Sequence, residues 1–144
     1  MVDGVGNLLT HLARCCQPIP GDEIVGFITK GRGVSIHRRS CEQLKALAAA
    51  EPEKVVPAEW GGTEDKTYTI TMRITGQDYS GMLRDITTLI ANEKLNIAGV
   101  RSRTESKNMT SIIDIDLLVS GLSAFDRLAV KLRAIPQITS VERL

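Results

Sequence analysis

The chain has 144 residues, 42% of them hydrophobic, and a formal net charge of +1, which is typical of a globular protein. Its apolar runs are shorter than the roughly 20 residues that a membrane-spanning helix needs. Residues 1–6 lack a basic segment followed by an apolar one, so no signal peptide is expected. Aromatic residues make up 3%, which argues against stacking platforms for single strands, and the near-neutral charge excludes wholesale electrostatic binding to nucleic acid.

The first part of the chain predicts a small β-rich domain over residues 1–60. Two strands are expected at residues 22–29 and 34–37, with a glycine-containing turn between them at 30–33. A helix is expected at residues 41–50 and a further strand at 54–60. Ser40 and Gln43 form a Ser-x-x-Gln capping box at the start of the helix, and the helix ends before Pro52. Residues 7–14 fit either a helix or a strand.

A polar, glycine-containing stretch at residues 61–66 predicts a linker to a second domain over residues 67–144. The second domain shows the order β-α-β-β-α-β, with strands at residues 68–75, 95–104, 109–120 and 137–144, and helices at 82–94 and 123–135. Ser80 or Asp78 is the expected cap of the first helix, and Ser123 with Asp126 forms a weak capping box for the second. This order predicts a ferredoxin-like fold with its helices on one face of an antiparallel sheet.

Alternation along the predicted strands assigns the two faces of this sheet. The face toward the helices is expected to carry Tyr68, Ile70, Met72, Ile74, Ile113, Ile115, Leu117 and Val119. The opposite face is expected to carry Thr69, Thr71, Arg73, Asp114 and Asp116, together with Ile112 and Leu118. The apolar pair suggests that a partner chain covers part of this second face.

Four side chains offer metal-binding chemistry. Cys15 and Cys16 are adjacent, and His37 and Cys41 follow in a His-x-x-x-Cys pattern. Three cysteines and one histidine form an allowed tetrahedral zinc site, and Cys41 at a helix start favours the thiolate. The residues alone leave two other interpretations open: buried packing of free cysteines, and a thiol nucleophile built on Cys15 or Cys41 with His37. The odd number of cysteines without a secretion signal indicates the reducing cytoplasm.

Two further patterns point to anion binding. No acidic residue lies between Glu23 and Glu42, whereas this stretch contains Lys30, Arg32, Arg38 and Arg39. These four cations predict a compact basic surface for phosphates, or else an ordinary solvated loop. The turn at residues 78–81 opens a helix, where backbone N–H groups bind a carboxylate or a phosphate, unless Gly81 only permits a tight turn.

The residues that carry these patterns also resemble a known family. The runs Leu12-Ala13-Arg14-Cys15-Cys16-Gln17-Pro18-Ile19-Pro20-Gly21-Asp22 and Gly31-Arg32-Gly33-Val34-Ser35-Ile36-His37-Arg38 are similar to the C-terminal regulatory region of RelA/SpoT-family (p)ppGpp synthetases. Residues 78–86 resemble the first loop and helix of that family's ACT domain. Residues 7–9 and 91–94 are similar to the synthetase-only RelA branch. The resemblance covers essentially the whole chain.

The resemblance implies a zinc-finger-like, or ribosome–intersubunit, domain followed by an ACT domain. The chain would then be a non-catalytic fragment of a GTP diphosphokinase of the stringent response. It would dock on the ribosome when uncharged tRNA occupies the A site and contact large-subunit RNA. Through that contact it would control the distant catalytic domains. The implied zinc ligands are Cys15, Cys16, His37 and Cys41, and the implied RNA contacts are Arg14, Lys30, Arg32, Arg38 and Arg39.

The ACT resemblance implies a homodimer, and in some relatives a branched-chain amino acid at the interface. The implied ligand residues are Asp78, Tyr79, Ser80 and Gly81, with Asn96 and Ile97 from the partner chain. Tyr79 stands where an Arg or Lys is expected. The alternatives to a ribosome-sensing module are therefore an amino-acid sensor that acts through dimerisation and the thiol enzyme described above.

Overall fold

The chain forms two compact units, residues 1–66 and 67–144. The computed structural model describes residues 2–3, 9–61 and 66–144. Most of the linker predicted at residues 61–66 lies outside the described residues, as do residues 7 and 8 of the stretch whose structure the sequence left undecided. Within the described ranges, no helix combines the length and apolar character needed to cross a membrane.

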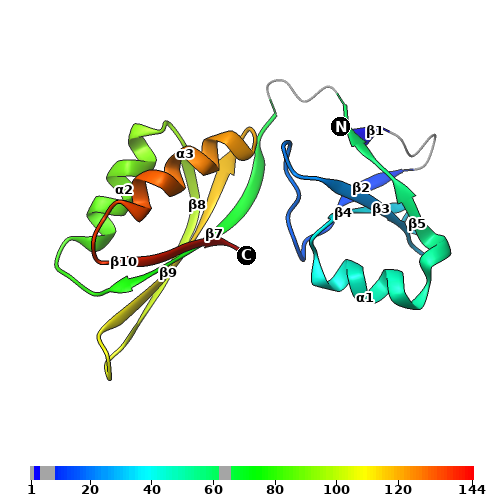
Figure 1. Ribbon diagram of the computed structural model, residues 1–144. Helices are drawn as coiled ribbons and strands as arrows, with labels where there is room; N and C mark the ends of the chain where they lie inside the picture. The colour runs from blue at the N-terminus through cyan, green and yellow to red at the C-terminus, as the bar shows by residue number, and fades with distance from the viewer. Residues whose placement is uncertain (1, 4–8, 62–65) are drawn as a thin grey trace. The chain divides into compact units, whose positions relative to one another are not determined.

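The first unit is built on a four-stranded sheet in the order β2-β4-β3-β5 (Figure 1). Its strands are Thr10–Leu12, Ile24–Ile28, Val34–Arg38 and Val55–Pro57 for β2 to β5, and Val2–Asp3 (β1) pairs with Glu59–Trp60 (β6). The undecided segment becomes β2, which pairs in parallel with β4. The strand predicted at residues 54–60 is present in two parts, β5 and β6, and Lys54 belongs to a 3-10 turn over Pro52–Lys54. Pro57 ends β5 because proline has no N–H for the ladder.

The helix of the first unit is α1 (Glu42–Ala50), close to its predicted range. Its predicted cap is wrong, because the N-cap residue is Cys41 and no side-chain oxygen caps the helix. The backbone N–H of Cys41 donates to the carbonyl of Arg38 at 3.0 Å. This turn places the Cys41 thiol, in place of the Ser40 hydroxyl, at the start of the helix.

The second unit has the predicted β-α-β-β-α-β order. Its elements are β7 (Tyr68–Gln77), α2 (Met82–Asn92), β8 (Asn96–Glu105), β9 (Thr110–Val119), α3 (Leu122–Arg133) and β10 (Ile138–Arg143). The strands form an antiparallel sheet in the order β10-β7-β9-β8, and both helices lie on one face of it (Figure 1). The ferredoxin-like prediction is confirmed.

The two faces of this sheet follow the predicted alternation. Every second residue of β7 and β9 is buried beneath the helices, including the eight apolar residues predicted for that face. On the opposite face, Arg73 donates two hydrogen bonds to Asp114 at 2.8 and 2.9 Å. Asp116 accepts hydrogen bonds from Thr71 at 2.8 Å and from Arg101 at 3.0 and 3.1 Å. These hydrogen bonds link side chains of β7, β9 and β8 across the sheet.

The predicted side-chain caps of α2 and α3 are wrong. Glycine occupies both N-cap positions, Gly81 and Gly121, and no side-chain cap bond forms at either helix. Asp78 instead accepts a hydrogen bond from Ser111 of β9 at 2.9 Å, and Gly81 adopts a φ of 87°, which permits the tight turn. Ser123 lies inside the first turn of α3, so it does not serve as a cap.

The pair of Arg73 and Asp114 predicts how the second unit responds to acid. The hydrogen bonds from Arg73 hold the pKa of Asp114 below its usual value, so the unfolded state binds this proton more readily than the folded state. Stability from this pair is present above about pH 4 and is lost as the pH falls further. We expect the unfolding free energy of Asp114→Asn to decrease less as the pH falls below about 4 than that of the unmodified chain. Urea unfolding followed by the fluorescence of Tyr68 and Tyr79 measures this free energy. The exposed Asp126→Asn is the control, and an equal change in both variants would contradict the prediction.

Candidate metal centre

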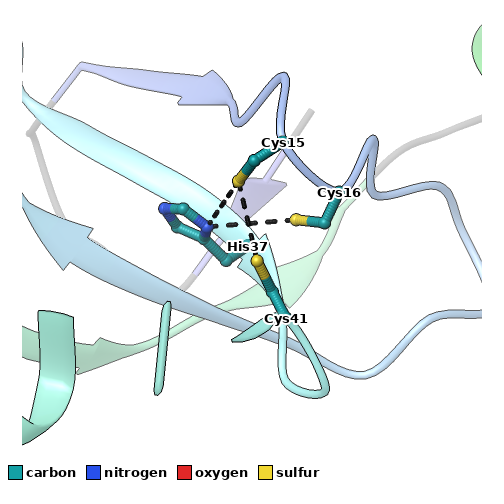
Figure 2. A group of neighbouring side chains, drawn as sticks. All are labelled: Cys15, Cys16, His37 and Cys41. Atoms are coloured by element: carbon teal, nitrogen blue, oxygen red, sulfur yellow. Dashed lines mark hydrogen bonds between the residues drawn. The ribbon is translucent and has the colours of Figure 1, made fainter. Parts of the chain in front are cut away.

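Three separate segments bring the four predicted ligands together. Cys15 and Cys16 lie in the turn after β2, His37 lies on β4, and Cys41 is the N-cap residue of α1. The Cys15 Sγ atom lies 3.5 Å from His37 Nδ1 and 3.6 Å from Cys41 Sγ, and Cys16 Sγ lies 3.9 Å from His37 Nδ1. Figure 2 shows that the four side chains point toward a common centre.

These distances fit a tetrahedral metal ion. Ligand atoms bound to zinc at about 2.0–2.3 Å lie about 3.5–3.8 Å from one another at the corners of a tetrahedron. The shortest separations fall in or next to this range, and all four ligand atoms lie within 4.8 Å of one another. The cluster is therefore within reach of one metal ion, and its three sulfur atoms and one nitrogen atom are ligands that zinc prefers.

Neighbouring groups orient two of the ligands. The Ser35 hydroxyl forms a hydrogen bond with His37 Nε2 at 3.1 Å, and both residues are buried. When Nε2–H donates to Ser35, Nδ1 retains the lone pair that a metal ion needs. The backbone N–H of Arg38 donates to Cys16 Sγ at 3.3 Å, a contact that stabilises a thiolate. Hydrogen bonds from Ser35 and from the Arg38 backbone therefore support two of the four possible ligands.

The cysteine protons are held unequally. Burial, followed by the Cys41 side chain, raises the pKa of Cys15 to about 12, and burial also raises the pKa of Cys16. Burial raises the pKa of Cys41 as well, but the backbone N–H of Leu44, hydrogen bonds with Cys15 and Cys16 and the backbone N–H of Gln43 together outweigh burial, so the net pKa is lowered. Burial lowers the pKa of His37 and keeps its ring neutral. A divalent cation must displace the remaining thiol protons to bind here.

The geometry does not favour the thiol-enzyme alternative. Cys15 is the exposed cysteine, and its raised pKa is the opposite of an activated nucleophile. Cys41 has a lowered pKa, but it is buried, and its Sγ atom contacts Cys15 Sγ at 3.6 Å. The second nitrogen of His37 contacts Ser35, and within the described residues no carboxylate forms a hydrogen bond with this ring. Packing does contribute to the site, since Cys16 and Cys41 are buried in one apolar cluster with Phe27.

The structure divides the five predicted RNA contacts into two groups. Arg14, Lys30 and Arg32 line one open hollow of about 1190 Å³, which also contains Cys15 and His37. Arg38 and Arg39 lie at the far end of β4, since Val34 follows the turn and Arg38 ends the strand. The five-residue strand separates the turn that carries Lys30 and Arg32 from Arg38 by about 13 Å, whereas Arg14, two residues beyond the pair of Leu12 with Ile36, lies level with Arg38. The compact basic surface stays a prediction. Sequence reasoning missed His11 and Lys54, which also line the hollow.

The predicted ACT ligand loop borders a smaller hollow. Asp78, Tyr79 and Gly81 line about 270 Å³ together with residues of β8 and β9, whereas Ser80 does not. The Tyr79 hydroxyl donates to Asp85 at 2.9 Å, and desolvation together with this bond raises the pKa of Tyr79. Asn96 and Ile97 lie exposed at the start of β8, outside this hollow, and their predicted role belongs to a partner chain.

Comparison with known proteins places the two units in defined families. A family model for the RelA/SpoT RIS domain matches residues 1–61, and one for the ACT domain matches residues 64–143. The GTP pyrophosphokinase of Escherichia coli K12 is 49% identical over all 144 residues, and that of Haemophilus influenzae is 45% identical over the same span. The GTP pyrophosphokinase of Streptomyces coelicolor is 36% identical over 104 residues, 72% of this chain.

The two domains in this order define a RIS–ACT region. With the identity across its whole length, the chain belongs to the RelA/SpoT family. It spans 19% of the length of the Escherichia coli and Haemophilus influenzae relatives and 12% of the Streptomyces coelicolor relative. The crystal structure of the ACT domain from GTP pyrophosphokinase of Chlorobium tepidum has a TM-score of 0.49 at 26% identity, covering 55% of this chain and all of that one.

Proposed function

We propose that this chain is the non-catalytic regulatory region of a GTP pyrophosphokinase. In this role it senses amino-acid starvation by docking on the ribosome, contacts large-subunit RNA and controls distant catalytic domains. The observation that supports the proposal is the pair of adjoining matches, RIS over residues 1–61 and ACT over residues 64–143, in a chain 49% identical to a GTP pyrophosphokinase. A zinc ion held by Cys15, Cys16, His37 and Cys41 would fix the RIS unit.

Ribosome binding tests this proposal directly. We expect the chain to sediment with ribosomes that carry uncharged tRNA in the A site, and to do so less with vacant ribosomes. Since its net charge is only +1, the interaction depends on local cations, and it should weaken steeply as salt increases. If the chain pellets to the same extent with and without ribosomes, the docking role is contradicted.

The 270 Å³ hollow favours a second candidate, an amino-acid sensor in the ACT unit. The adjoining β8 is an edge strand whose residues are almost all exposed, including Ile97 and Val100, and a second copy of the chain would cover it. Calorimetry with valine, isoleucine and leucine, with light scattering to measure the mass of the protein, separates the two candidates. Heat accompanied by a change in mass supports the sensor, and no heat with any of the three rejects it.

A further inference from the structure

We infer that Cys15 and Cys41 form an intramolecular disulfide bond when a small peroxide reaches them, and that this bond and a bound metal ion exclude each other. The inference assigns a redox modification to two of the four candidate ligands, which goes beyond the proposed function. It depends on the positions of the two thiols and on no contact with the ribosome, so either proposal can fail while the other stands.

The two sulfur atoms already lie close together. Cys15 Sγ is 3.6 Å from Cys41 Sγ, although the residues are 26 positions apart in the sequence (Figure 2). A disulfide bond needs about 2.05 Å, so the two atoms must approach by about 1.5 Å. Cys15 stands in the turn after β2, and Cys41 precedes the first residue of α1. Both side chains can therefore rotate without breaking a strand ladder or a helix.

The surroundings give the two thiols different roles. Cys41 is the N-cap residue of α1, where free backbone N–H groups favour a thiolate, and it is 8% exposed, so only a small oxidant reaches it. Cys15 is exposed and lines the open hollow of about 1190 Å³, which gives its side chain room to move. Cys41 therefore suits the sulfur that attacks the peroxide, and Cys15 suits the sulfur that closes the bond.

The reaction takes place in two displacements. The Cys41 thiolate attacks one oxygen of hydrogen peroxide, the O–O bond breaks, and a sulfenic acid and a hydroxide ion result. The Cys15 sulfur then attacks the Cys41 sulfur, the S–O bond breaks, and the departing hydroxide takes up the Cys15 proton as water. Two thiol sulfurs lose two electrons in total, and these electrons reduce the peroxide. A dithiol reductant reverses the modification by thiol–disulfide exchange.

The third cysteine is excluded from the bond. Cys15 and Cys16 are adjacent, and the roughly 3.8 Å between neighbouring Cα atoms is shorter than the roughly 4.4–6.8 Å that disulfides usually span. Cys16 is 3% exposed, and its Sγ atom accepts a hydrogen bond from the Arg38 N–H at 3.3 Å. Cys16 therefore stays a thiol when Cys15 and Cys41 are oxidised.

The disulfide and a metal ion compete for the same sulfur atoms. A metal ion binds thiolates, so the bond removes two of the four candidate ligands and leaves Cys16 and His37. Two ligands are fewer than the four of a structural zinc site. Loss of one outer contact already weakens metal binding by about 10- to 100-fold, so we expect the oxidised chain to bind zinc at least about 100-fold more weakly than the reduced chain.

Peptide mapping of the folded chain tests the inference. The purified chain is treated with hydrogen peroxide, and its remaining thiols are blocked with an alkylating reagent. Trypsin then gives one peptide over residues 15–30, with Cys15 and Cys16, and another over residues 40–45, with Cys41. We expect a linked pair that carries one blocked thiol and that dithiothreitol separates. Fragment ions should assign the bond to Cys15, and the blocked thiol to Cys16, without any variant.

Zinc binding is measured on the same samples. A chromogenic chelator should detect zinc release in step with the formation of the linked peptides. Excess zinc added before the peroxide should slow the linkage, because it occupies both sulfur atoms. Equal zinc affinity of the oxidised and the reduced chain would overturn the mutual exclusion, and so would a linkage rate that does not depend on zinc.

Two adjacent substitutions form a matched pair. Cys15→Ser and Cys16→Ser each remove one candidate ligand, but only Cys15→Ser removes the partner of Cys41. We expect Cys16→Ser to form the linked peptides, and Cys15→Ser to stop at a sulfenic acid on Cys41 that dimedone traps in the 40–45 peptide. Linkage in Cys15→Ser, a bond between two chains, or an unmodified chain without linked peptides would overturn the inference. Ribosome co-sedimentation of the reduced chain decides the proposed function separately.

Discussion

Chelation of the purified chain is expected to release one zinc ion and to unfold the RIS unit while the ACT unit stays folded. The reason is that the cluster joins the turn after β2, the strand β4 and the start of α1. The apolar core at this point is small, with Ala13, Phe27 and Leu44 buried beside Cys16 and Cys41. A unit of this size has a marginal core, and structural zinc contributes about 10–16 kcal/mol of apparent binding free energy in zinc-finger peptides. Native mass spectrometry counts the metal ion.

Trp60 reports which unit unfolds. It is the chain's single tryptophan, and its Nε1 donates to the Asp22 carbonyl at 3.1 Å within the RIS unit. We expect chelator to change its fluorescence, and His37→Ala to reproduce the change without chelator. The matched control is His11→Ala, because His11 is exposed and lies outside the cluster. If the chain without metal keeps the native Trp60 fluorescence, the prediction is contradicted, and the four residues contribute only packing to the unit.

The ACT fold could be predicted from sequence because its strands alternate cleanly. One face of β7 and β9 is buried, so apolar residues recur at every second position, and this period is visible in the sequence alone. Ile86 and Ile90 of α2, and Leu128 and Leu132 of α3, are spaced by four residues and indicate the helices in the same way. The helix caps could not be predicted in this way. Asp78 has a better partner in Ser111, which is distant in the sequence, and Cys41 replaces Ser40 because of the turn before α1.

The four possible metal ligands could be predicted from the sequence, but the residues that line the neighbouring hollow could not. Cysteine and histidine are few, so their types already indicate a zinc set, and the structure gathers all four. The predicted hairpin already places Lys30 and Arg32 in its turn and Arg38 and Arg39 after its second strand, whereas Arg14 lies in the segment 7–14 that the sequence left undecided. His11 and Lys54 reach the hollow only through β2 and the 3-10 turn, and the sequence left the first of these elements undecided.

Replacing Gly33 by alanine should destabilise the RIS unit by about 3 kcal/mol, against about 1 kcal/mol for Gly31→Ala. Both glycines have positive φ, 73° and 77°, so alanine strains the backbone at each position. They differ in space: a Cβ at Gly33 would lie 2.2 Å from the Leu9 carbonyl oxygen, whereas a Cβ at Gly31 would meet nothing within 4 Å. Urea unfolding followed through Trp60 measures both values.

The Gly33 substitution should also weaken ribosome binding, because the loss of stability and the loss of binding both follow from displacement of the Leu9 carbonyl. The Leu9 oxygen that a Cβ would displace accepts the Val34 N–H at 2.7 Å, at the point where β2 and β4 begin to pair. Loss of that bond frees the turn that carries Lys30 and Arg32, whereas Gly31→Ala leaves the turn anchored. In the absence of urea, and at a temperature where both variants are folded, Gly33→Ala should therefore sediment less with ribosomes than Gly31→Ala. Equal binding by the two would show that the rigidity of the turn does not contribute to docking.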